Sequence, residues 1–333
     1  MSLDLTIIWA GIIGTAIVLY VIMDGFDLGI GILFPQFDVG DERDRTMNSI
    51  APVWDGNETW LVLGGGGLLA AFPLAYAIIL PALYAPLIAM LLGLVLRGVA
   101  FEFRWRDAAH RALWDAAFTL GSTVAAVAQG VTLGALLQGI TVTGRAYGGG
   151  WWEWLTPFSL LTGVGLAIGY ALLGSCWLIW KTEGALQAKA FGLARPLGVA
   201  LIVAIAAVSA ATPFLQQHYY IRWLSFPGVL ATAQVPLASA IVTFLFFRSL
   251  AKRHEVAPFA YALALFGLCL IGLGISIWPD VIPGRVSIWQ AAAPYQSQLF
   301  MLVGVSIMLP IILAYTGWAY WVFRGKVGAH GYH

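Results

Sequence analysis

Long apolar stretches, separated by short polar or turn-forming segments, recur along the chain from Leu5 to Phe323. A helix needs about 20 apolar residues to cross the hydrocarbon core of a bilayer, and each stretch reaches that length. The pattern predicts an all-α integral membrane protein, with nine transmembrane helices in a single polytopic domain that spans residues 1–333. The helices are expected at residues 5–34, 51–72, 74–101, 114–140, 157–180, 195–215, 229–250, 257–278 and 297–323.

The connections between these helices alternate sharply in basic charge, which is the property that orients a membrane protein. One set of connections holds only Arg145, Arg222 and Arg285 of the 17 Lys and Arg residues. Because cytoplasmic connections carry the basic excess, we expect the N-terminus on the periplasmic side and the C-terminus in the cytoplasm. The basic set comprises Arg43, Arg45, Arg97, Arg104, Arg106, Arg111, Lys181, Lys189, Arg195, Arg248, Lys252, Arg253, Arg324 and Lys326.

The composition agrees with a chain whose main solvent is lipid. Of the 333 residues, 60% are hydrophobic and 10% are charged, whereas soluble domains carry about 25% charged residues. The net charge of +1 and the scattered basic residues form no continuous stripe, which excludes nucleic acid as a partner. The two cysteines, Cys176 and Cys269, fall in separate apolar helices and are interpreted as packing residues.

Two pairs of carboxylates fall inside the predicted spans. Asp24 and Asp27 lie in the first helix, and Asp55 and Glu58 lie in the second, each pair at a spacing of i and i+3 that shares one helical face. A charged side chain at the centre of a bilayer costs about 2.5–3.5 kcal/mol on insertion scales, so such residues are functional candidates. The first helix ends and the second begins on the cytoplasmic side, so both pairs are expected at a similar depth.

The third predicted helix returns to that side with Arg97 and Glu102. The first three helices are therefore expected to gather five carboxylates and one guanidinium near the cytoplasmic surface. Three interpretations remain open: a proton entrance, a structural network neutralised by Arg97, and a cation held near Asp24, Asp27 and Asp55.

The histidines argue against a haem ligated by this chain. Intramembrane haem iron takes axial ligands such as His, Met or Cys from within the spans, yet every histidine falls in a loop, at a helix end or in the tail. The sequence also has no nucleotide-binding loop and no nucleophile elbow, so the isolated chain is not expected to be catalytic. The five histidines are His110, His218, His254, His330 and His333.

Three motifs carry a resemblance to a known family. They are residues 23–29 (MDGFDLG) at the end of the first helix, 48–58 (NSIAPVWDGNE) at the start of the second, and 96–104 (LRGVAFEFR) at the end of the third. Together they resemble subunit II of the cytochrome bd quinol oxidases. Glu58 stands where many members have Gln, and the chain is short, which is more similar to the cyanide-insensitive branch of the family.

The resemblance implies two four-helix bundles plus one peripheral helix, paired with a similar subunit I in a pseudo-twofold heterodimer of the bacterial cytoplasmic membrane. Subunit I is expected to bind quinol and to ligate all the haems, a low-spin and a high-spin haem b together with haem d or a further haem b. The complex would oxidise ubiquinol or menaquinol and reduce dioxygen to water with protons from the cytoplasm. Further partners would be membrane lipids and a small accessory subunit of one helix.

The resemblance also assigns roles to residues. It places Asp55 on a water-filled proton path toward the haems and Trp60 beside an apolar route for oxygen, with packing as the alternative role of Trp60. Asp24 and Asp27 are expected to support the proton path, to hold a cation or to pin the first helix against the second.

A proton-coupled secondary transporter or channel is the alternative function, because nine helices with buried carboxylates would suit one.

Overall fold

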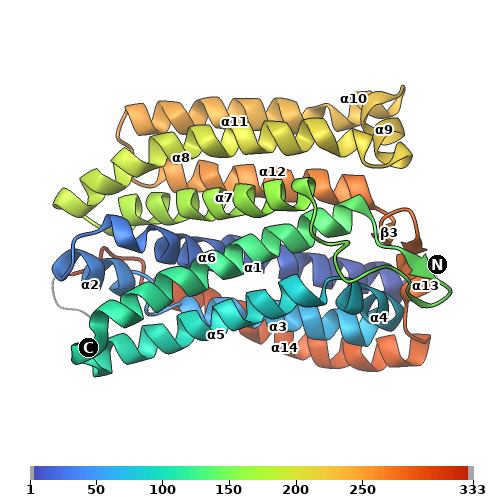
Figure 1. Cartoon of the computed structure of the whole chain (residues 1–333), viewed down its shortest axis with the longest axis horizontal. Helices are drawn as coiled ribbons and strands as arrows, with labels where there is room; N and C mark the ends of the chain where they lie inside the picture. Colours follow the sequence, from blue (N-terminus) through green and yellow to red (C-terminus); the bar gives the residue numbers. More distant parts are fainter. Residues whose placement is uncertain (1–3, 329–333) are drawn as a thin grey trace.

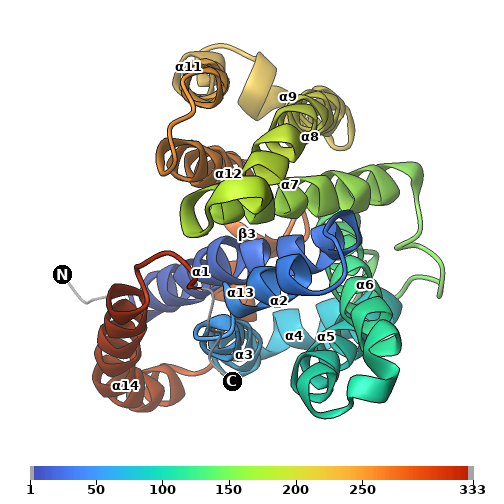
Figure 2. The same ribbon diagram turned by 90° about the vertical axis from the view of Figure 1, so that its left-hand side faces the viewer.

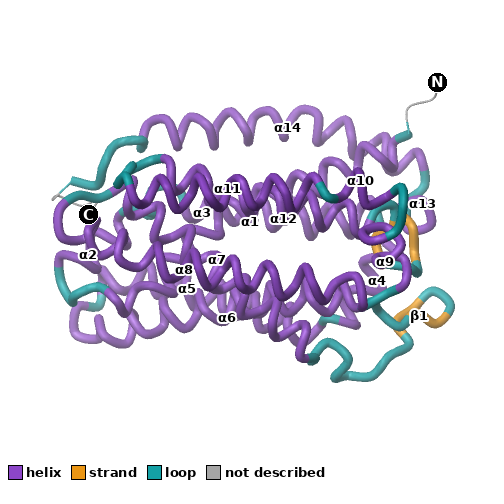
Figure 3. The backbone as a smooth tube through the Cα atoms, turned by 90° about the horizontal axis from the view of Figure 1, so that it is seen from above, coloured by secondary structure: helices purple, strands orange, loops and turns teal. Residues whose placement is uncertain are grey.

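The computed structural model describes residues 4–328, and its long helices run side by side along one axis (Figures 1 and 3). Eight of the described helices are long and apolar enough to cross a membrane, and the number reaches nine if the bent pair α3–α4 is one span. The prediction of an all-α membrane protein is confirmed. The long helices are α1 (Leu5–Leu33), α3 (Trp54–Ala71), α5 (Tyr84–Arg106), α6 (Arg111–Gln138), α7 (Pro157–Lys181), α8 (Gly184–Ala211), α11 (Gln234–Ala251), α12 (Ala257–Ile277) and α14 (Tyr295–Val322).

Short elements close the two ends of the helix array. One end carries α2 (Asp41–Asn48) and the single 3₁₀ turns η1 (Phe34–Gln36) and η2 (Ala108–His110). The other end, where α1 begins, carries two small antiparallel hairpins (Figure 3). The remaining elements are α4 (Pro73–Ala82), η3 (Thr212–Phe214), α9 (Gln217–Leu224), α10 (Gly228–Thr232) and α13 (Ile288–Ala291), and the hairpins pair β1 (Val142–Thr143) with β2 (Ala146–Tyr147) and β3 (Asp280–Ile282) with β4 (Val286–Ser287).

The third predicted helix, 74–101, is wrong as one element. The structure divides it into α4 and α5 at Leu83, and α4 is bent by 120° from α3 at Phe72. Pro81 has no backbone N–H to donate within α4, which favours the end of that helix shortly afterwards. The second part then continues to Arg106, because the charged residues at its end remain helical beyond the apolar stretch.

The sixth predicted helix, 195–215, begins too late. Helix α8 begins at Gly184, and Lys189 in its second turn forms ion pairs with Asp38 and Glu42. Hydropathy located only the apolar part of this helix, since its first turns carry polar residues. The predicted helix 229–250 is divided between α10 and α11, and the other six predictions agree with the observed bounds to within about three residues.

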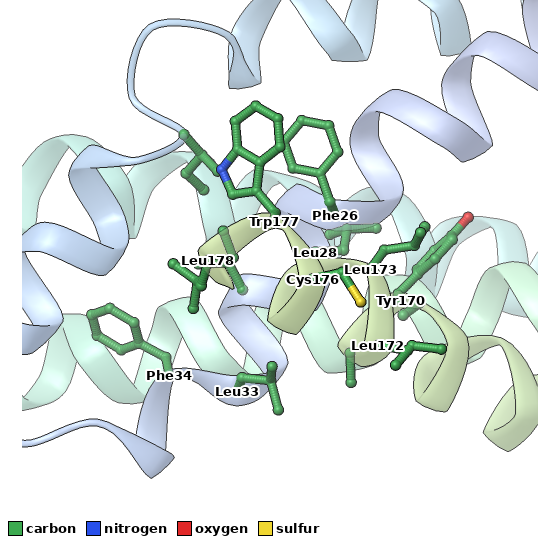
Figure 4. Close-up of a cluster of buried hydrophobic side chains, with 14 of the residues drawn as sticks. Phe26, Leu28, Leu33, Phe34, Tyr170, Leu172, Leu173, Cys176, Trp177 and Leu178 are labelled. Carbon is green, nitrogen blue, oxygen red and sulfur yellow. The ribbon is translucent and has the colours of Figure 1, made fainter. Parts of the chain in front are cut away.

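Helix α1 lies at the centre of the array, and glycines allow its neighbours to approach closely. It packs against α3, α6 and α7, while α8, α11 and α12 lie beyond α7 (Figure 2). A Cβ added at Gly29 would lie 1.8 Å from the carbonyl oxygen of Tyr170, so α1 and α7 touch through their backbones. Around this contact the rings of Phe26 and Trp177 stack with centroids 4.2 Å apart (Figure 4).

Helix α14 differs from all of these, since it lies at the margin of the array (Figure 2). It contacts α1 and α3, but Gln298 is the one residue of α14 that is buried within the described part of the chain. Most of its other residues are exposed and apolar, including Phe300, Ile307 and Trp318. In a membrane protein this face must meet lipid or another subunit.

Candidate functional site

The second half of α1 is enclosed on all sides, and it carries two carboxylates. Every residue from Asp24 to Gly31 is buried, and Asp24 and Asp27 are each 0% exposed. Burial follows from the position of α1 between α3, α6 and α7. A carboxylate in this place cannot be solvated by bulk water, so it depends on hydrogen bonds and charges supplied by the protein.

Arg97 supplies the positive charge from α5. Its Nη1 donates to Asp24 Oδ1 at 2.7 Å and its Nη2 donates to Glu58 Oε1, while its guanidinium lies 5.6 Å from the ring of Trp54. Arg97 is 1% exposed, whereas the side chain of Glu58 is 29% exposed. The planar fork of the guanidinium therefore joins a fully buried carboxylate to one that reaches the surface of the chain.

Asp27 has a different partner. Asn57 Nδ2 donates to Asp27 Oδ2 at 2.7 Å and to the carbonyl of Met23 at 3.2 Å, and Asn57 Oδ1 accepts a bond of 3.0 Å from the hydroxyl of Tyr320 on α14. Within the described residues Asp27 has no ion pair. Asp24 Oδ2, Asp27 Oδ1 and Arg97 Nε are buried atoms that find no hydrogen-bond partner in residues 4–328.

The charges of this acid cluster, defined as Asp24, Asp27, Glu58 and Arg97, do not balance. Three carboxylates face one guanidinium in a site that is largely shielded from water. Unpaired buried charge is costly, so the cluster is more stable when it also holds a proton. The arrangement is chemically able to bind a proton, and Glu58 is its partly exposed member.

The other two predicted acids are placed differently. Asp55 lies one turn before Glu58 on α3, is exposed, and is an electrostatic neighbour of Glu58. Glu102 is not brought into the cluster: its side chain is 56% exposed and its carboxylate lies 3.7 Å from the guanidinium of Arg106, its neighbour four residues further along α5. The expected group of five carboxylates is therefore reduced to three, with Asp55 beside it.

A second set of hydrogen-bonded polar side chains lies one turn before Asp24 along α1. Gln129 on α6 donates to the hydroxyl of Tyr20 at 2.7 Å and accepts from the hydroxyl of Tyr170 at 2.9 Å. Tyr20 lies one turn before Asp24 on α1, and Tyr170 belongs to α7. Hydrogen bonding between helices accounts for Gln129. Its two bonds connect α1, α6 and α7 next to the acid cluster.

The cation interpretation is not supported. The part of the chain that the structure describes contains no group of three or more His, Cys, Asp or Glu side chains placed to hold a metal ion. Asp24 and Asp27 instead turn to Arg97 and Asn57, and Asp55 faces outward.

Trp60 lies inside the chain rather than on its surface. Its side chain is 1% exposed and packs with Ala16 and Tyr20 of α1 and with Leu309 and Ile312 of α14. Its indole Nε1 is buried and finds no hydrogen-bond partner among residues 4–328. Shape and apolar contact, rather than hydrogen bonding, hold this ring in place.

The described histidines lie in short connections or at helix ends. His110 lies in the turn η2 and pairs with Asp107 at 2.9 Å, His218 lies in the short helix α9, and His254 is exposed after α11. The predicted histidine positions His330 and His333 lie outside the described residues. Among residues 4–328, His110 lies at the first turn of the candidate span Ala108–Gln138 with an exposed side chain, and His218 and His254 lie outside the candidate spans.

Fold and site together define a multi-pass helical membrane protein with an ionisable cluster inside its helix array. Comparison with known families gives the particular class: residues 5–323 match the family described as cytochrome bd terminal oxidase subunit II. The chain belongs to this family. It is a subunit of a respiratory terminal oxidase of the bacterial cytoplasmic membrane, an oxidoreductase complex that contains haems and a partner subunit I. Membership sets aside the transporter alternative.

Individual relatives agree along nearly the whole length. The chain is 28% identical to the cytochrome bd-I ubiquinol oxidase subunit 2 of Escherichia coli, with 97% of this chain and 95% of the relative covered. It is 27% identical to the cytochrome bd ubiquinol oxidase subunit 2 of Bacillus subtilis, with 96% of both covered. A chain of the bd oxidase from Geobacillus thermodenitrificans shares the fold, with a TM-score of 0.78 at 15% identity over 97% of this chain and 100% of that one.

Asn57 and Tyr320 are members of the site that sequence reasoning missed. Asn57 lies between Asp55 and Glu58 in the same helical turn, so its position within an acid motif was an available signal. Tyr320 gave no local signal, because it reaches the site from 263 residues further along the chain.

Proposed function

We propose that this subunit carries part of the cytoplasmic proton path of a quinol:oxygen oxidoreductase. One observation supports the proposal above all others: three carboxylates, two of them fully buried, lie around the single guanidinium of Arg97, which forms ion pairs with Asp24 and Glu58 but not with Asp27. A purely structural network would be more stable with balanced charges. A surplus of buried carboxylates suits a group that takes up and releases protons.

The order of exposure gives the path a direction. Asp55 is exposed, Glu58 is partly exposed, and Asp24 and Asp27 are buried. Protons would arrive at Asp55 and pass to Glu58, and Arg97, which stays protonated, would hold the carboxylates of Glu58 and Asp24 near each other. Asp55 and Glu58 lie one helical turn apart on α3, and transfer between them would require a hydrogen bond, either direct or through one water molecule.

The proposed orientation places the α2 end in the cytoplasm and the N-terminus in the periplasm. Arg43, Arg104 and Arg111 lie at the α2 end, which fits the excess of basic residues on cytoplasmic sides. The proposed arrangement comprises a bundle of α1, α3, α5 and α6, a second bundle of α7, α8, α11 and α12, and α14 as the peripheral helix. The end-on view in Figure 2 supports this division.

Subunit I is proposed to cover the face of α3 that exposes Asp55, forming a pseudo-twofold heterodimer. A carboxylate exposed to lipid tails would cost about 2.5–3.5 kcal/mol, and a partner with polar groups or water would remove that cost. Subunit I would ligate the low-spin and high-spin haem b and the haem d or b, and it would bind ubiquinol or menaquinol. A single-helix accessory subunit and membership of the cyanide-insensitive branch remain predictions.

Asp55→Asn tests the proposal in the purified complex. Oxygen reduction with quinol should slow by about tenfold or more, equivalent to about 1.4 kcal/mol of barrier, while the haem absorption spectrum remains intact. Glu102→Gln is the matched control, because it also removes one exposed carboxylate near the same end but lies outside the cluster. Equal turnover in both variants would leave a structural network as the better account.

A further inference from the structure

Helix α14 is attached to the acid cluster although little of it is buried in the chain. Along its 28 residues, Gln298 is buried near the first turn, where its carbonyl accepts from Trp9 Nε1 at 3.1 Å. Near the other end, the hydroxyl of Tyr320 donates to Asn57 Oδ1 at 3.0 Å, and the ring of Tyr320 lies edge-on to Trp177. Between these two points the contacts of α14 are apolar.

The direction of the hydrogen bonds at Asn57 follows from its surroundings. The amide nitrogen faces two acceptors, the carboxylate of Asp27 and the carbonyl of Met23. Rotating the amide by 180° would place its oxygen against both acceptors, which is repulsive, so the nitrogen must face them. The oxygen of Asn57 then requires a donor, and Tyr320 is that donor.

Asp27 depends on this arrangement because it has no cation of its own. Asn57 is its hydrogen-bond partner, and the other oxygen of its carboxylate is unpartnered within residues 4–328. The charged and titratable groups that face it are Asp24 on α1, Glu58 on α3, Arg97 on α5 and Tyr320 on α14. On the α6 and α7 side, Tyr170 faces Asp24 rather than Asp27.

We propose that Asn57 and Tyr320 are positioning residues that control proton exchange at Asp27, and that they connect this exchange to the packing of α14. The inference rests on the proposed role of the acid cluster in proton transfer. A hydrogen bond to a carboxylate favours its ionised form, so the orientation of Asn57 decides how readily Asp27 binds a proton. A partner that packs against the exposed face of α14 would therefore change the position of the helix that carries Tyr320.

The test uses Tyr320→Phe in the whole oxidase complex, because this change removes the hydroxyl and keeps the ring. The pH–rate profile of quinol oxidation should move to higher pH by about half a unit, since Asp27 loses part of the support for its ionised form. Asn57→Leu should move the profile further in the same direction. The control is Tyr315→Phe, which removes an exposed hydroxyl from the same helix.

A double variant separates this inference from the function on which it rests. If Tyr320 acts through Asp27, Tyr320→Phe should have no further effect in an Asp27→Asn background. A Tyr320→Phe profile identical to that of Tyr315→Phe would overturn the inference, as would a shift that persists without Asp27. If Asp27→Asn alone left turnover and its pH dependence unchanged, the proton path through the cluster would fail first.

Discussion

Two buried arginines, Arg97 and Arg104, lie seven residues apart on α5 and are both 1% exposed. Their surroundings differ in charge: carboxylates alone surround Arg97, whereas further arginines accompany the carboxylates around Arg104. Arg97 faces three carboxylates, and several buried polar atoms around it are unpartnered within the described chain. Arg104 donates to Asp44 at 2.7 Å and to Asp115, which also accepts from Arg43 at 2.7 Å.

The comparison separates an arginine in a charge-balanced network from one in a cluster with surplus carboxylates. Around Arg104 each carboxylate has at least two basic neighbours, since Arg111 also approaches Asp44 at 3.8 Å, and the rings of Phe34 and Trp105 cover the guanidinium. Such a network holds α2, α5 and α6 together. Because arginines already neutralise its carboxylates, an added proton would not stabilise it. The Arg97 cluster has the reverse imbalance, which makes proton binding its natural way to reduce charge.

The largest expected effect belongs to Arg104→Met. Removing this guanidinium leaves Asp115 at a buried site with one cation fewer, and breaking a buried ion pair costs about 3–5 kcal/mol. The complex should lose thermal stability, measured as a lower unfolding temperature and a lower yield, while turnover per haem in the surviving complex remains normal. A stable complex with impaired turnover would mean that the two arginines have the same role.

Asp27→Asn should give the opposite pattern, namely impaired turnover with normal thermal stability. The expected effect in free energy is smaller than that of Arg104→Met. The change keeps the size of the side chain and removes one of three carboxylates from an acid-rich site, so thermal stability should be unchanged or higher. Oxygen reduction should fall by about tenfold, or about 1.4 kcal/mol of barrier, since a proton-binding group is lost. Steady-state oxygen consumption and a melting curve on the same preparation test both parts. A large loss of stability with normal turnover per haem would assign Asp27 to the structural class.

Particular residues show how far the sequence predicted this site. Asp24, Asp27, Glu58 and Arg97 do meet, because intramembrane charge and helical spacing were sufficient signals. Glu102 was expected with them, but five residues along a helix turn by roughly 140°, so it faces away from Arg97. Attention to the helical phase would have excluded it.

Other features required three-dimensional information. Hydropathy did not show the break at Leu83, because the residues on both sides of it are apolar and Pro81 is its one local signal. The contact of Tyr320 with Asn57 depends on how α14 packs after 263 intervening residues. Hydropathy gives the number and approximate bounds of helices, whereas their mutual packing decides which polar side chains meet.

The smallest expected effect concerns Trp60, which lies two residues after Glu58 on α3. We propose that Trp60 borders an apolar oxygen route, supported by its wholly apolar packing between α1, α3 and α14. Trp60→Phe removes no hydrogen bond within the described chain, so it changes shape alone. The KM for oxygen should change by about twofold, or about 0.4 kcal/mol, with kcat at saturating oxygen unchanged. Trp177→Phe is the matched control, since Trp177 is also almost fully buried and its indole Nε1 likewise finds no hydrogen-bond partner among residues 4–328. If both variants lower thermal stability and neither alters the KM for oxygen, Trp60 is a packing residue.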